Sequence, residues 1–88
     1  MTGKTDEQQR RVARVVSQVI LETSGRCVEP AAQEALFEKG FLESVDLVHL
    51  VLALQTEFDI VLDAAETNPR TMGSITAITG LVASRATE

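Results

Sequence analysis

The sequence predicts an all-α fold: a small antiparallel four-helix bundle with three main helices, one short helix and a long first loop. Apolar residues recur at helical spacing in three separate stretches, and aliphatic side chains are abundant while the only aromatic residues are three Phe. A chain of 88 residues is long enough for one small domain. We therefore interpret residues 1–88 as a single domain, with residues 1–5 as a disordered tail.

The first helix is expected from Asp6 to Leu21. Its apolar residues follow one another at alternating steps of about three and one, which is the pattern of one helix face packed on a core. These residues are Val12, Val15, Val16, Val19 and Ile20. The Ser24-Gly25 pair is expected to end this helix.

A long connection, residues 23–43, follows the first helix and contains Gly25, Pro30 and Gly40. Residues 34–38 could form a short helical turn within it. Loops of this length in small domains are often mobile, but this one carries several apolar side chains that could hold it on the core. They are Val28, Leu36, Phe37, Phe41 and Leu42.

The second helix is expected from Ser44 to Phe58, with Ser44 as its N-cap and Asp46 complementing the helix dipole in the first turn. At about 100° per residue, its apolar side chains fall into two groups. The expected core face consists of Leu47, Leu50, Val51, Leu54 and Phe58. A second group, Val45, Val48 and Leu52, lies roughly 130° away. We interpret it as an exposed contact surface; the alternative is that the long loop covers it.

The C-terminal third is expected to be irregular from Asp59 to Arg70, with the short fourth helix over residues 63–67. Asn68-Pro69 breaks that segment. Thr71 is then the predicted cap of a last helix that Gly80 weakens. Its inward residues are Met72, Ile75, Ile78, Leu81 and Val82.

Several kinds of chemistry find little support in the sequence. The only histidine, His49, follows Ser44 by five residues, which turns the two side chains roughly 140° apart on a helix and disfavours a Ser-His pair. One His, one Cys and scattered carboxylates match no metal-ligand spacing, so no metal site is predicted. With Cys27 as the only cysteine, an internal disulfide is excluded. We therefore expect a protein that is not an enzyme.

The charge distribution favours protein partners. The formal net charge is −5, and residues 27–66 hold nine acids against Lys39 alone, a net −8. Such a surface repels nucleic acid and anionic membranes and attracts basic protein patches, although acidic residues also serve solubility. The sequence contains no apolar run long enough to span a bilayer, and residues 1–14 are too polar for a signal peptide. We expect a cytoplasmic protein.

The stretch from Gly40 to Ile60, with its Phe-Leu-Glu-Ser-Val-Asp-Leu run, resembles the acyl carrier proteins, and the resemblance is looser from Thr71 to Ile78. Chain length, acidity and element order agree with that family. The resemblance implies that Ser44 accepts 4′-phosphopantetheine from coenzyme A through a Mg²⁺-dependent phosphopantetheinyl transferase. The arm's thiol would then carry acyl groups as thioesters between partner enzymes, including a loading ligase or acyltransferase and acyl-processing enzymes with basic docking patches. A carrier of this kind is expected to be a monomer.

The resemblance also assigns partner contacts around Ser44. Glu43 stands where the family has an Asp, and the contact residues would be Glu43, Val45, Asp46, Val48, His49, Leu52 and Glu57. His49, Gln55 and Thr56 stand where carriers of fatty-acid synthesis often have acids, which favours a specialised fatty-acid, lipid or polyketide-type pathway. The Phe-Leu-Glu-Ser run is also similar to the Leu-Leu-Asp-Ser of D-alanyl carriers, so an aminoacyl cargo is an alternative. A further alternative is an unmodified helical interaction or scaffold module.

Overall fold

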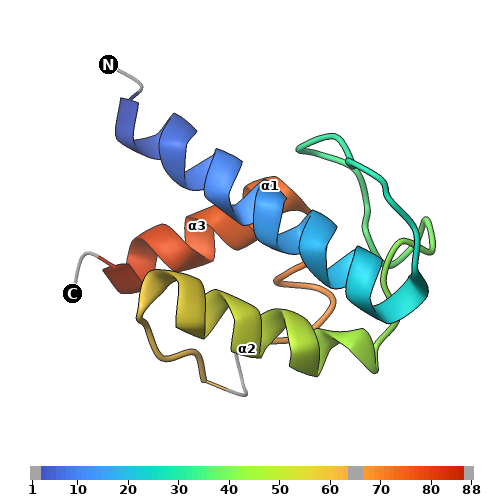
Figure 1. Ribbon diagram of the computed structural model, residues 1–88. Helices are drawn as coiled ribbons and strands as arrows, with labels where there is room; N and C mark the ends of the chain where they lie inside the picture. Colours follow the sequence, from blue (N-terminus) through green and yellow to red (C-terminus); the bar gives the residue numbers. More distant parts are fainter. Residues whose placement is uncertain (1–2, 64–66, 87–88) are drawn as a thin grey trace.

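The computed structural model describes residues 3–63 and 67–86, with side chains from Glu7 to Arg85. Three helices occur in these residues, α1 (Gly3–Ser24), α2 (Asp46–Phe58) and α3 (Ile75–Ala86), and the same residues contain no strand. In Figure 1, α2 runs antiparallel to α1 while α3 crosses α1 at a wide angle, and α1 contacts each of the other helices more than they contact one another. The all-helical prediction is confirmed. The predicted short helix over 63–67 falls mostly on 64–66, outside the described residues.

Helix α1 begins at Gly3, three residues before the predicted start at Asp6. Residues 3–5 of the predicted disordered tail are thus helical, whereas Met1 and Thr2 lie outside the described residues. At the other end, the Gly25 N–H donates to the Leu21 carbonyl at 2.9 Å and Gly25 adopts a φ of +75°. This left-handed glycine ends the helix, as the sequence predicted.

The core is formed by the faces that the apolar periodicity predicted. Val12, Val16 and Ile20 of α1 are fully buried, and so are Leu50 and Leu54 of α2. From the C-terminal part, Met72, Ile75, Ile78 and Val82 complete the buried cluster, with Leu81 packed against it as a half-buried side chain. No described helix is long and apolar enough to cross a membrane.

The long connection between α1 and α2 is held on the core, as its apolar residues predicted. Leu36 and Leu42 are buried, and the Leu42 N–H donates to the Leu36 carbonyl at 3.1 Å. Leu36 in turn donates its N–H to the Gly73 carbonyl at 2.7 Å, which ties the loop to the start of α3. A helical turn does form near residues 35–40, closed by Gly40 at a φ of +81°.

The same loop is braced by Glu34. The Ala31 N–H donates to Glu34 Oε1 at 2.7 Å, and Lys39 Nζ lies 3.3 Å from Glu34 Oε2. The bond from Ala31, followed by the contact with Lys39, lowers the pKa of the Glu34 carboxyl below its usual value. Both interactions favour the ionised side chain and keep this part of the loop folded.

The cap of α3 differs from the prediction. The helix begins at Ile75, and Ser74 Oγ accepts the Ala77 N–H at 3.1 Å, so Ser74 caps it rather than Thr71. Thr71 instead belongs to a turn in which Asn68 Oδ1 accepts the N–H groups of Arg70 and Thr71. Because the side-chain oxygen of Asn68 takes up these two N–H groups, the helix starts about one turn later than predicted.

Candidate functional site

Ser44 lies in a tight turn directly before α2. We call residues Glu43 to Asp46 the Ser44 turn. The Asp46 N–H donates to the Glu43 carbonyl at 2.8 Å, and the Leu47 N–H donates to the Ser44 carbonyl at 3.1 Å. Glu43, Ser44 and Val45 are exposed, while Leu42 just before them is buried. The serine is therefore presented to solvent from a backbone that is held on both sides.

The predicted role of Ser44 as helix N-cap is wrong. Helix α2 begins at Asp46, and Val45 at the cap position has helical dihedral angles (φ −68°, ψ −26°) and forms no side-chain cap bond. The capping interaction comes from the opposite direction, because Asp46 Oδ2 accepts the Glu43 N–H at 3.0 Å. This is the reaching-back half of a capping box, with the acid three residues into the turn. Among the described residues, none forms a hydrogen bond with the Ser44 hydroxyl.

An apolar stripe begins beside the serine, and its exposure agrees with the prediction. Val45 is 71% exposed, Val48 64% and Leu52 56%, whereas Leu50 and Leu54 on the core face are fully buried. The alternative that the long loop covers these three side chains is excluded. We keep the name apolar stripe for Val45, Val48 and Leu52. Together with Ser44 it forms one continuous strip along the solvent side of α2.

The acids near the stripe differ in availability. Glu43 is exposed, whereas Asp46 is half-buried and holds the Ser44 turn. Glu57 lies in an ion pair with Arg11 of α1, with 3.1 Å between Oε2 and Nε, and Arg11 Nη2 also donates to the Glu57 carbonyl at 2.9 Å. The Arg11 guanidinium stacks over the Phe58 ring, 4.5 Å from its centre. Two of the three expected acidic contacts thus have intramolecular partners.

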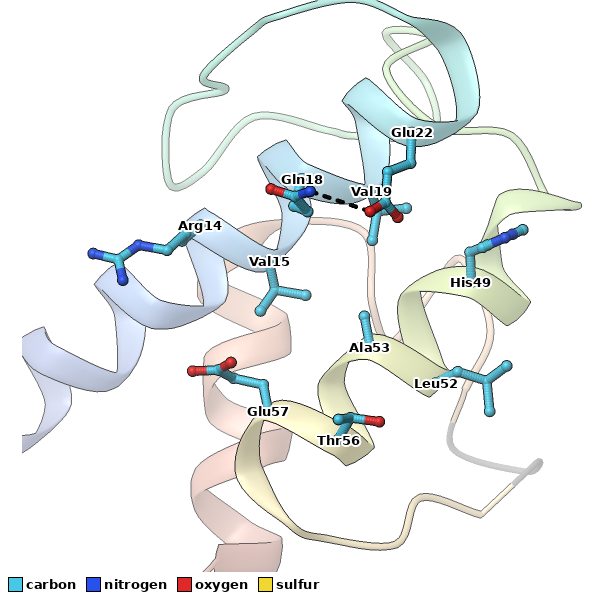
Figure 2. A pocket seen from close by; sticks show the side chains of 10 residues that line it. All are labelled: Arg14, Val15, Gln18, Val19, Glu22, His49, Leu52, Ala53, Thr56 and Glu57. Carbon is cyan, nitrogen blue, oxygen red and sulfur yellow. Dashed lines mark hydrogen bonds between the residues drawn. The ribbon is translucent and has the colours of Figure 1, made fainter.

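An open groove of about 510 Å³ separates α1 from α2 beside the stripe (Figure 2). Val15, Val19 and Ala53 form its apolar lining, and Figure 2 shows Val15 and Ala53 facing each other across it. The rim is polar on both sides, and on α1 the Gln18 amide donates to Glu22 Oε2 at 3.1 Å. His49 and Leu52 line the groove from α2. Leu52 therefore connects the groove to the apolar stripe.

His49 is exposed on the groove side of α2, five residues after Ser44 in the sequence. The two side chains lie in different surroundings, because Ser44 is next to the apolar stripe while His49 lines the groove. In the part of the chain that the structure describes, no group of three or more His, Cys, Asp or Glu side chains could hold a metal ion.

The end of α2 carries one more exposed apolar residue. Asp59 adopts a left-handed conformation (φ 56°) and ends the helix, with its N–H bonded to the Gln55 carbonyl. The Gln55 side chain accepts the Leu62 N–H at 2.9 Å, which folds the following segment back against α2. Leu62 is buried there, whereas Val61 is 78% exposed.

The groove and the tie between Arg11 and Glu57 were not predicted from the sequence. Both join α1 to α2, and Arg11 and Glu57 are 46 residues apart. The available signal was Ala53, a small residue beside large ones on α2, which leaves room between two helices. The candidate site thus consists of Ser44 in its turn, the apolar stripe and the adjoining groove. No protein-family model matches this chain, and no curated protein matches it either.

Proposed function

We propose that this protein is a carrier that resembles the acyl carrier proteins and bears 4′-phosphopantetheine on Ser44. The observation that carries the proposal is the exposed Ser44 hydroxyl on a turn that Leu42 anchors upstream and the Leu47–Ser44 backbone bond closes downstream. The group fits this position, because Glu43 and Val45 on either side are exposed and leave the hydroxyl open to an enzyme. A serine set within a core would offer no such approach.

The attachment needs a partner enzyme. The Ser44 Oγ attacks the phosphorus of coenzyme A that carries the pantetheine arm, and the bond from that phosphorus to the nucleotide half breaks. The serine proton would pass to a base on the transferase, and the nucleotide half would leave as a nucleoside bisphosphate whose charge Mg²⁺ would balance. The arm supplies a thiol that holds acyl groups as thioesters. This chain contributes the nucleophilic oxygen and its placement.

The surface around Ser44 suits transient docking. The apolar stripe gives partner enzymes an exposed contact area, and the surrounding acids attract basic patches on those partners. Glu43 is the acid best placed for such a contact, because it is exposed and adjacent to the serine. A flexible arm on Ser44 would raise the effective concentration of its cargo at each partner's active site.

The cargo class has one alternative. The Phe-Leu-Glu-Ser run is similar to the serine motif of D-alanyl carriers as well as to that of acyl carriers, so the thioester would hold an aminoacyl group in the second case. Loading by an acyl ligase or an aminoacyl ligase, compared on the same modified protein, separates the two. The stripe serves docking in either case.

An unmodified interaction module is the second candidate function. It is favoured by Glu43, which is one methylene longer than the acid that carriers have before the serine. Such a module would use the apolar stripe without any prosthetic group. Its partner binding would then be insensitive to coenzyme A and to a transferase.

The test is modification by a broad-specificity phosphopantetheinyl transferase with coenzyme A and Mg²⁺, followed by peptide mapping. We expect one adduct on the peptide that contains Ser44, and none in the Ser44→Ala variant. Ser24→Ala is the matched control, since Ser24 is another exposed serine at a helix end and its loss should leave the adduct in place. An adduct that survives in Ser44→Ala would contradict the assignment.

A further inference from the structure

Asp46 has a position that a partner-contact role alone does not explain. Its side chain is half-buried, and its Oδ2 accepts the Glu43 N–H at 3.0 Å while its own N–H donates to the Glu43 carbonyl at 2.8 Å. Two hydrogen bonds thus join Glu43 and Asp46, one in each direction. They close the turn whose second residue is Ser44.

We infer that Asp46 is a positioning residue for modification at Ser44, acting through the Glu43 N–H rather than through contact with the transferase. This inference rests on the proposed function. The upstream chain is fixed at Leu42 by burial and by its bond to Leu36, and the downstream chain is fixed by the buried Leu50 of α2. Between these two fixed points, the Asp46 carboxylate accepts the Glu43 N–H and so restrains the backbone of Glu43 and Ser44.

The bond between Asp46 and the Glu43 N–H controls the direction in which the Ser44 hydroxyl points. Because the Ser44 side chain itself forms no hydrogen bond with the described residues, its placement depends on the backbone that carries it. Loss of the Asp46 bond frees the Glu43 N–H and allows the turn to fray away from α2. A small displacement of the Ser44 oxygen from its reactive position slows the transfer, even when the transferase still binds this protein.

The two roles of Asp46 make different predictions for two substitutions. Asp46→Asn removes the charge but keeps a side-chain oxygen that can accept the Glu43 N–H. Asp46→Ala removes both. If Asp46 positions Ser44, the Asn variant is modified almost like the original protein while the Ala variant is slow. If Asp46 instead meets a basic residue of the transferase, both variants lose the contact and behave alike.

The experiment measures kcat and KM for transferase-catalysed modification of the full chain, with coenzyme A and a broad-specificity transferase. We expect Asp46→Ala to lower kcat about tenfold with little change in KM, which is the scale of one lost charge-assisted hydrogen bond. Asp46→Asn should stay within about twofold of the original kcat. Asp63→Asn is the matched control for charge, because Asp63 is an exposed acid outside the Ser44 turn.

Hydrogen exchange at the Glu43 amide gives a second readout that does not depend on the transferase. We expect the Glu43 N–H to be protected in the original protein and in Asp46→Asn, and to exchange faster in Asp46→Ala. Equal loss of kcat, or equal rise of KM, in both Asp46 variants would overturn the inference in favour of direct contact. Unchanged kinetics in a folded Asp46→Ala variant would overturn it as well.

The outcome for the original protein separates this inference from the proposed function. If the original protein is not modified by any transferase, the proposed function fails and the inference about Ser44 fails with it. If the original protein is modified and the two Asp46 variants behave alike, only the inference fails. Circular dichroism of each variant shows whether the helices are intact.

Discussion

At the scale of single residues, side chains that accept backbone N–H groups mark the starts of α2 and α3. Asp46 accepts the Glu43 N–H before α2, and Ser74 accepts the Ala77 N–H before α3. The bond to Ala77 satisfies a donor that the start of α3 leaves without an intrahelical partner, and the bond to Glu43 satisfies a donor in the turn before α2. Ser44 therefore does not cap α2, and its hydroxyl lies exposed on an ordered turn.

Gly73 is a position where any side chain would be out of place. A Cβ added at Gly73 would lie 2.9 Å from the Pro69 carbonyl oxygen, and the Gly73 carbonyl accepts the Leu36 N–H. We expect Gly73→Ala to lower the free energy of unfolding by about 1–3 kcal/mol because the turn before α3 must shift. Chemical denaturation measures this change.

Gly80 provides the matched control for that substitution. It lies within α3, and a Cβ there would meet no heavy atom of the described residues within 4 Å, apart from its chain neighbours and the adjacent backbone of α3. Gly80→Ala should raise the free energy of unfolding by about 0.5–1 kcal/mol, since alanine restricts the unfolded chain and favours helix. Equal effects of the two substitutions would contradict the described packing at Gly73.

The sequence correctly predicted Asp46 in the first turn of α2, but its prediction of Ser44 as the cap was wrong. A serine or threonine followed by apolar residues is the usual pattern of an N-cap, and both Ser44 and Thr71 match it. The actual caps depend on local turns that compete for the same N–H groups, as Asn68 does before α3. Such competition is decided by backbone geometry, which residue types alone do not specify.

At the scale of helices, α1 and α2 are joined by apolar packing on one side and by Arg11 on the other. Arg11 bonds to both the carboxylate and the backbone carbonyl of Glu57 and covers the ring of Phe58. The groove lies along the same pair of helices, and its lining on α2 extends from His49 to Glu57. Glu57 therefore takes part both in the tie between the two helices and in the lining of the groove.

Replacing Arg11 with alanine should lower the free energy of unfolding by about 1 kcal/mol, because a half-exposed ion pair and a cation–π contact are lost together. The reduction should shrink in high salt, which screens the ion pair. Thermal unfolding at low and high salt measures both effects. Arg10→Ala is the control, since Arg10 is exposed beside it on α1; a loss of the same size there would contradict the role given to Arg11.

Apolar periodicity predicted all three helices and both faces of α2, because burial imposes the spacing directly. Leu50 and Leu54 are buried, and Val48 and Leu52 are exposed, on the two faces expected. Periodicity carries no information about which helices pack against each other. The groove and the contact between Arg11 and Glu57 depend on that placement and so could not be predicted.

At the scale of the whole molecule, the core and the proposed docking surface lie on different faces of one helix. The exposed apolar stripe contributes little to the core, so it can change without loss of the fold. Val61, held near the end of α2 by the bond between Leu62 and Gln55, adds another exposed apolar side chain. Exposed apolar side chains that lie together on one helix face, as Val45, Val48 and Leu52 do, are typical of a contact surface.

A pair of substitutions on α2 tests this separation. Leu52→Ser should change the free energy of unfolding by less than about 0.5 kcal/mol and raise the KM for the transferase severalfold, since Leu52 is exposed on the stripe. Leu54→Ala, two residues on and fully buried, should cost about 2–5 kcal/mol. Denaturation and modification kinetics measure the two properties separately. A KM that is unchanged in Leu52→Ser would remove the stripe from the docking surface.

The central claim is that Ser44 carries a phosphopantetheine arm. The most direct test is the intact mass of the original protein after incubation with coenzyme A, Mg²⁺ and several phosphopantetheinyl transferases. The account predicts a single added phosphopantetheine group per chain, mapped to Ser44. An unchanged mass with every transferase would contradict the carrier role and favour an unmodified module that binds partners through the apolar stripe.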